Sequence, residues 1–288
     1  MSLRTVAVTD RDDPPDGAPD GAPEAGAPTW LDHRPGPGGA PVRRTVTVHA
    51  WMETRLLLRN PEQLLVAVVI PLLALVVLDR TSLLDSSLRP GLTRVDLALP
   101  GVLALAALST AFTSTAITTG FDRRYGVLRR LGATPLSRAA LVGGKVLSVL
   151  AVLVGQVVVL TAAAVPLGWR STGVGAPGVL GALLLLVLGV AALVPVALLV
   201  GGTLRAEATL AVANVVYVLL LGLSAVLVPA DRYPPPVAAV ATGLPSGALA
   251  EGLRSAATGS GVPAGSLLAL LLWATVGTLA CARWFRWD

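Results

Sequence analysis

Apolar and polar positions divide the chain into three regions. Residues 1–42 are rich in Asp, Gly, Pro and Ala and show no apolar periodicity, residues 43–62 mix apolar side chains with arginines, and residues 63–288 are dominated by long apolar runs. A polar segment rich in Gly and Pro cannot bury enough apolar surface to offset its chain entropy. We therefore predict that residues 1–42 form a disordered acidic tail on the cytoplasmic side.

Six charge-poor runs follow, and a helix that crosses a bilayer needs about 20 mainly apolar residues. The pattern predicts an all-α polytopic membrane protein with six transmembrane helices. We expect the spans at 63–78, 97–120, 146–167, within 179–204, within 208–228 and at 266–282.

Residues 233–250 also lack charge, but prolines and glycines interrupt them. Three consecutive prolines, 234–236, are followed by Gly243, Pro245 and Gly247, and proline breaks the hydrogen-bond ladder of a straight helix. Within residues 229–265 we therefore predict an extracellular or re-entrant segment with short helices before the sixth span.

Residues 43–62 suit an amphipathic helix lying in the membrane interface. Trp51 and Met52 supply apolar surface, while Arg55 and Arg59 can extend to the lipid headgroups. Asn60 and Pro61 then break the helix before the first span. An irregular juxtamembrane linker is the alternative interpretation.

The composition excludes a water-soluble enzyme. Hydrophobic residues make up 54 % of the 288 residues and charged residues 14 %, whereas soluble domains carry about 25 % charged residues. The net charge of +5 does not indicate a nucleic-acid partner, because Arg and Lys concentrate in loops on the same side as the tail. This asymmetry predicts that both termini face the cytoplasm.

The chain offers no candidate catalytic group and no metal site. Its histidines, His33 and His49, have no further ligand at metal-site spacing, and Cys281 is the single cysteine. Gly143-Gly144-Lys145 lacks the other residues of a phosphate-binding loop. The six spans carry no Asp, Glu, Lys, Arg or His away from their ends, which argues against a proton-driven carrier. Any nucleotide that energises transport must therefore bind another chain.

Polar side chains within the spans are candidates for a substrate path. The alternative is that hydroxyls bond to carbonyls one turn back and that the amides and the tyrosine hold helices together. The candidates are Thr110, Thr113, Ser114, Gln156, Asn214 and Tyr217.

The loop at residues 121–145 is the largest predicted cytoplasmic connection. It contains a basic helix with Arg123, Arg124, Arg129 and Arg130, then a turn, and then Ser137, which can cap a new helix. Such a helix could dock in a groove of a cytoplasmic partner. The alternative is that it serves as an orientation signal on lipid headgroups.

The same loop resembles the central loop of type-2 ABC exporter permeases, the class that contains the daunorubicin-resistance permease. An acid is followed by the pattern Arg-x-x-Gly-x-Leu-Arg-Arg-Leu-x-Ala-Thr-Pro-Leu-Ser-Arg and by Gly-Lys before the third span; Asp122 stands where Glu is usual. The resemblance implies that this loop couples the permease to an ATPase. The implied coupling residues are Asp122, Arg123, Gly126, Arg129, Arg130, Thr134, Pro135, Leu136, Ser137 and Arg138.

Two further segments, 54–78 and 244–254, are similar to the interface helix with the first span and to the segment before the last span of that family. The resemblance implies a permease subunit in a bacterial cell membrane. It pairs with a second permease, expected to be another copy of this chain, and with two copies of a separate ABC ATP-binding subunit, which holds the ATP and Mg²⁺. A hydrophobic or amphipathic cargo such as a drug, lipid or glycan would move outward. A non-transporting membrane scaffold and a nucleotide-independent channel are the alternatives.

Overall fold

A computed structural model describes residues 41–88, 90–134, 137–170 and 175–285. The predicted tail, apart from its last two residues, lies outside these ranges. The described part is helical and contains no strand, which confirms the all-α class. The elements are α1 (Val42–Leu58), α2 (Pro61–Arg80), the 3₁₀ turn η2 (Ser82–Ser87), α3 (Arg94–Ala107), the π-helical segment η3 (Leu108–Ser114), α4 (Thr115–Arg124), α5 (Val127–Gly132), α6 (Arg138–Ala164), α7 (Ala176–Thr203), α8 (Ala206–Leu223), the 3₁₀ turn η5 (Ala230–Arg232), α9 (Pro235–Gly243), α10 (Pro245–Ala257) and α11 (Ala264–Trp284).

Five stretches of the described chain are long and apolar enough to cross a bilayer: α3 through α4, α6, α7, α8 and α11. They coincide with five of the six predicted spans. The remaining predicted span corresponds to α2, a 20-residue helix with Pro71 in its interior. Polytopic membrane architecture is thus confirmed, while the number of six spans stays a prediction.

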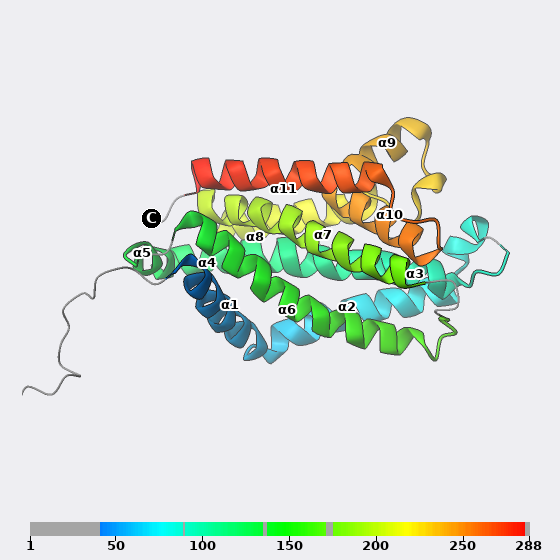
Figure 1. The fold of residues 1–288 in the computed structure, drawn as a ribbon, viewed down its shortest axis with the longest axis horizontal. Coiled ribbons are helices and arrows are strands. Elements are labelled where there is room, and N and C mark those ends of the chain that lie inside the picture. Colours follow the sequence, from blue (N-terminus) through cyan, green and yellow to red (C-terminus); the bar gives the residue numbers. More distant parts are fainter. Residues whose placement is uncertain (1–40, 89, 135–136, 171–174, 286–288) are drawn as a thin grey trace, which may run out of the picture. The chain divides into compact units, whose positions relative to one another are not determined.

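The stretch from α3 through η3 to α4 is the centre of the bundle (Figure 1). It begins with a capping box, in which the Asp96 carboxylate accepts a hydrogen bond from the Thr93 amide at 2.7 Å and the Thr93 hydroxyl accepts one from the Asp96 amide. In its most apolar stretch, 83 % is buried inside the protein, whereas in the most apolar stretch of α8 only 17 % is buried. The second predicted span is therefore a core helix, and α8 is peripheral.

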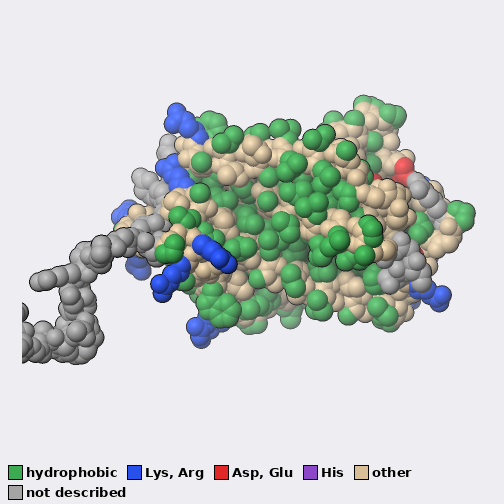
Figure 2. All heavy atoms as spheres, viewed as in Figure 1, with side chains coloured by type: hydrophobic (Ala, Val, Ile, Leu, Met, Phe, Trp, Pro, Cys, Tyr) green, Lys and Arg blue, Asp and Glu red, His purple; other side chains and the backbone are tan. Residues whose placement is uncertain are grey.

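Exposed apolar side chains on the peripheral helices repeat at helical spacing. On α11, Leu268, Leu272 and Leu279 are each more than 60 % exposed. Figure 2 shows hydrophobic side chains over the middle of the face in view, with most of its Lys and Arg side chains near the end that carries α5. A soluble protein would not expose such a surface, so this distribution fits a bundle surrounded by lipid.

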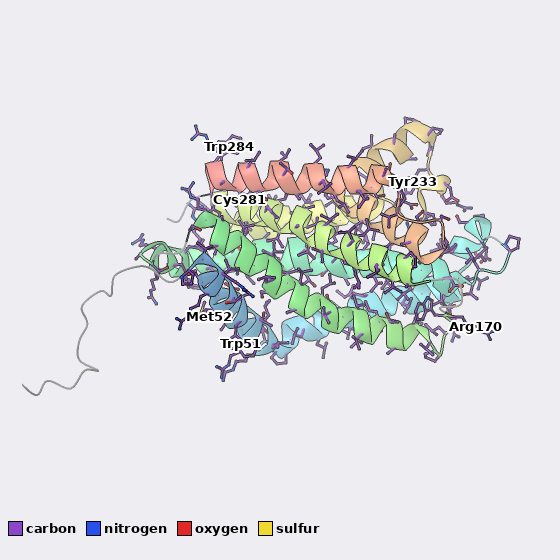
Figure 3. All side chains as sticks on the ribbon, in the orientation of Figure 1. Trp51, Met52, Arg170, Tyr233, Cys281 and Trp284 are labelled. Atoms are coloured by element: carbon purple, nitrogen blue, oxygen red, sulfur yellow. The ribbon has the colours of Figure 1, made fainter. Side chains whose placement is uncertain are left out.

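The two ends of the bundle differ in structure. The end opposite α5 carries η5, α9 and α10 (Figure 1), and the two helices confirm the short helices predicted before the last span. Trp51 and Trp284 project near the α5 end, whereas Tyr233 and Arg170 lie at the other end (Figure 3). Aromatic side chains near both ends match the belts that mark the two surfaces of a bilayer.

Candidate functional site

The described part of the predicted cytoplasmic loop, residues 121–134, 137 and 138, forms a bent segment that we call the elbow. Helix α4 ends at Arg124, and Gly126 adopts φ 71°, a left-handed conformation that glycine reaches without strain. The short helix α5 follows, and the Ser137 hydroxyl caps α6 by accepting the Ala140 amide at 3.1 Å. The predicted cap is confirmed. The prediction of one continuous basic helix is wrong, because the bend at Gly126 separates two arginines in α4 from two in α5.

Three arginines of the elbow fasten it to other helices. Arg123 donates to the Leu204 carbonyl at the end of α7 at 3.3 Å, and Arg138 donates to the Ala282 carbonyl near the end of α11 at 2.6 Å. Both guanidinium groups donate to carbonyls at a helix C-terminus, where no amide of the same helix is available as a donor.

The third fastening arginine is Arg124, which forms an ion pair with Glu207 in the first turn of α8. Together with the bonds of Arg123 and Arg138, this pair links the elbow to α7, α8 and α11. A displacement of the elbow would therefore act directly on the ends of three helices.

Arg129 and Arg130 differ from these three arginines. Both are exposed on α5 and have no hydrogen-bond or ion-pair partner within the described residues. Leu128 beside them is only 1 % exposed and anchors α5 to the core. Thr134 closes the following turn by donating to the Leu131 carbonyl. Pro135 and Leu136, two further predicted coupling residues, lie outside the described residues.

Asp122 belongs to a buried group of charges between α1, α4 and α6. The Lys145 ammonium lies 2.7 Å from Glu53 Oε2 and 3.8 Å from Asp122 Oδ2. The side chains of Lys145 and Glu53 are 7 % and 11 % exposed, and that of Asp122 is 33 % exposed. Sequence reasoning placed Asp122 in the coupling set but did not find Glu53, because no spacing within one helix predicts a pair 92 positions apart.

Close packing of α1 on α6 explains Gly144 and Lys145. A Cβ atom on Gly144 would lie 2.4 Å from Cδ2 of His49, so only glycine leaves room for this ring. A Cβ atom on Gly143 would lie 3.6 Å from Val46, an ordinary contact, so this position does not require glycine. Gly144 lets α1 approach the α6 backbone, and the adjacent Lys145 pairs with the carboxylate of Glu53.

His49 makes this helix contact sensitive to pH. Its Nε2 atom is buried, has no hydrogen-bond partner among the described residues, and lies 3.8 Å from Glu53 Oε1. Burial lowers the pKa of His49 below its ordinary 6.5; Glu53 partly opposes this, and Lys145 adds to it. When α1 is docked, the imidazole binds fewer protons than when it is exposed. Docking is therefore favoured above about pH 6.5 and weakened as the pH falls below that value.

Hydrogen exchange in residues 42–58 tests this effect. We expect the amides of α1 to exchange faster at pH 5.5 than at pH 7.5, after correction for the intrinsic pH dependence of exchange. His49→Leu should remove the difference, because the ring then no longer takes up a proton. An equal pH response in His49→Leu would contradict the assignment to His49.

Two of the predicted substrate-path residues join helices. The Gln156 side chain on α6 donates from Nε2 to the Ala67 carbonyl on α2 at 2.8 Å, and its Oε1 accepts the Thr110 hydroxyl at 3.1 Å. Pro71 has no N–H to bond to the carbonyl four residues earlier. That carbonyl belongs to Ala67, so Gln156 supplies the donor that the proline removes.

This geometry favours the packing interpretation of Gln156. Gln156→Leu is expected to leave the Ala67 carbonyl without a donor in an apolar interior, which costs about 1–3 kcal/mol. We expect a lower free energy of unfolding in a reversible detergent titration, with no change in which substrates are transported. Altered substrate preference at unchanged stability would instead place Gln156 in the path.

The remaining path candidates have different surroundings. Thr113 has a buried hydroxyl oxygen without a partner in the described chain, and Ser114 is half-buried. On α8, Asn214 is exposed and Tyr217 is half-buried. An amide on an apolar helix face is costly in lipid. Asn214 is therefore better suited to a protein contact or a polar path than to lipid.

Arg254, which the sequence placed in an outer loop, is buried in α10 with 4 % exposure. It donates to the carbonyls of Ala225 at 2.6 Å and Val226, and to Glu251 at 2.7 Å. These carbonyls follow the end of α8, and Ala225 has φ 55°. Arg254 thus satisfies the carbonyls of a bend after α8 that lies outside helical hydrogen bonding. In the sequence, Arg254 stood out only through the family resemblance of residues 244–254. That resemblance gave no indication that its side chain is buried.

The model of the ABC-2 type transporter family matches residues 45–257. The match begins within α1 and ends at the last residue of α10, so it contains the elbow, the ion cluster and Arg254. Comparison with curated proteins gave no match.

Proposed function

This chain belongs to the ABC-2 type transporter family, and we propose that it moves a hydrophobic or amphipathic substrate outward, driven by ATP hydrolysis on a separate subunit. Membership makes it the permease subunit of an ABC-type transporter and a multi-pass membrane protein, for which the bacterial plasma membrane is the usual location. It also implies association with an ATP-binding cassette subunit. The outward direction, the cargo class and the separate ATPase are parts of the proposal.

The elbow is the observation that carries this proposal. Its exposed surface presents Arg129 and Arg130 without described partners, while Arg123, Arg124 and Arg138 connect the same segment to α7, α8 and α11. Guanidinium groups suit carboxylates on a partner surface. A partner that moves on ATP hydrolysis would thus hold the elbow at α5 and displace helix ends in the membrane.

The proposed assembly contains two permease subunits and two ATPase subunits. Asn214 on the exposed face of α8 supports a second permease there, since a protein contact can satisfy its amide. We propose that this second subunit is another copy of the chain. ATP and Mg²⁺ would bind the ATPase subunits, and this chain would contribute no catalytic residue.

Affinity purification from native membranes tests the proposal. We expect an ATP-hydrolysing subunit to co-purify, and ATP to drive accumulation of an amphipathic substrate in inverted vesicles. Movement of substrate that does not need ATP would favour a channel. Partner binding without any ATP-dependent movement would favour a scaffold.

A further inference from the structure

A cavity of about 530 Å³ opens at the end of the bundle opposite α5. Its walls come from η2, the first turn of α3, η5, α9, α10 and the first two turns of α11. Its size is within the range of pockets that hold drug-sized molecules. None of the residues assigned to a substrate path lines it.

Charged groups in the lining leave an excess of negative charge. Asp231 and Glu251 contribute carboxylates, and Arg254 contributes one guanidinium. Arg254 already donates to the carbonyls of Leu97, Ala225 and Val226 and to Glu251 Oε1, so at most one of its five N–H groups is left for a ligand.

Each carboxylate keeps an oxygen available. Glu251 Oε1 accepts the Ala230 amide and the Arg254 guanidinium, and Asp231 Oδ1 accepts the Ser87 hydroxyl at 3.1 Å. The second oxygen of each group has no donor within the described residues. The cavity can therefore accept hydrogen bonds from a cation without losing its internal bonds.

Hydroxyl groups add further acceptors. Thr242 and Thr258 donate their protons to carbonyls of their own helices, at 2.9 Å and 3.0 Å, which leaves lone pairs free. Ser266 is only 7 % exposed, lines the cavity, and has no hydrogen-bond partner in the described chain. Its hydroxyl is therefore available to a ligand or to water in the cavity.

We propose that this cavity binds an amphipathic ammonium compound that also carries hydroxyl groups. Its ammonium would lie between Glu251 and Asp231, its hydroxyl would bond to Ser266, and its apolar part would contact Leu97 and Ala269 of the lining. The binding itself does not depend on transport. Only the further step, that such compounds are the cargo, rests on the proposed function.

Binding is measured on the chain without an ATPase, in nanodiscs of phosphatidylcholine. The probe is propranolol, a fluorescent aryl amino alcohol, and its matched neutral probe is 3-(1-naphthyloxy)propane-1,2-diol. We expect the amine to bind at least about tenfold more tightly than the diol, because a hydrogen bond to a charged group adds about 1.5–3 kcal/mol. Equal affinity of the two probes would overturn the proposal.

Variants locate the site. Glu251→Gln should weaken amine binding about tenfold, and Asp231→Asn up to about fivefold because Asp231 is more exposed. Ser266→Ala should weaken both probes, and Asp79→Asn, a carboxylate outside the lining, should change neither.

If Glu251→Gln fails to fold, Asp231→Asn and Ser266→Ala decide the result. Wild-type affinity in both of these variants would overturn the proposal. Because no ATPase is present, that failure is distinct from a failure of ATP-driven transport.

Discussion

Replacing Arg129 and Arg130 together by Glu is expected to reduce co-purification of the ATPase subunit at least about tenfold and to abolish ATP-driven transport. Both guanidinium groups are exposed on α5 and have no partner within the described residues. Reversal of two charges at a docking surface replaces attraction by repulsion, which costs several kcal/mol at an interface. The measurement is the amount of ATPase retained on the tagged permease and its substrate-stimulated hydrolysis.

The membrane part should remain folded in this variant. Leu128, which holds α5 against the core, is unchanged, and the three fastening arginines stay in place. Replacement of Arg129 and Arg130 by Lys keeps the charge and should restore most of the binding. As a charge-matched control, Arg80→Glu with Arg232→Glu alters exposed arginines of the opposite end and should leave co-purification intact. Wild-type co-purification and ATPase stimulation in the Arg129→Glu, Arg130→Glu variant would refute the docking role.

Lys145→Met is expected to destabilise the docking of α1 by about 3–5 kcal/mol, the usual cost of removing one member of a buried ion pair. Glu53 and Asp122 would then lie together without the ammonium that is 2.7 Å from one and 3.8 Å from the other. The expected results are a lower free energy of unfolding in a detergent titration and faster proteolysis within residues 42–58.

A second substitution separates the charge from simple loss of packing. Lys145→Met combined with Glu53→Met replaces the pair by apolar side chains, which is often close to neutral for stability. We therefore expect the double variant to be more stable than Lys145→Met alone. Should Lys145→Met unfold like the wild-type chain, the ion cluster would not be what holds α1 on α6.

The apolar runs predicted most of the helices but not their ends. The apolar run alone would start span three at residue 146, whereas the polar signal of Ser137 placed the start of the helix correctly, since α6 begins at Arg138. The second span was expected as one helix, and its π-helical segment η3 left no sign in the hydrophobic pattern. Hydropathy indicates whether a segment lies in lipid or in water. Caps and local interactions decide where its helix starts and whether it is α- or π-helical.

The candidate site was predicted unevenly for a similar reason. The position of the elbow, its Ser137 cap and its arginine content followed from the sequence. The sequence did not predict which of those arginines bond to other helices and which stay exposed. The partners of Arg123 and Arg138 lie 81 and 144 positions away in the chain. Gln156 was identified as a polar residue in need of a partner, but only the structure connects it to the carbonyl that Pro71 leaves open.

By itself the sequence determined that this is an all-α membrane protein with a basic loop between two of its spans, because apolar run length and the placement of arginines are local properties that lipid and water act on directly. The tertiary structure alone decided that Lys145 pairs with Glu53, that Arg254 is buried against the bend after α8, and that two carboxylates and a serine hydroxyl share one cavity. Those arrangements depend on helices far apart in the chain meeting at short distance, where burial gives each charge and hydrogen bond its strength.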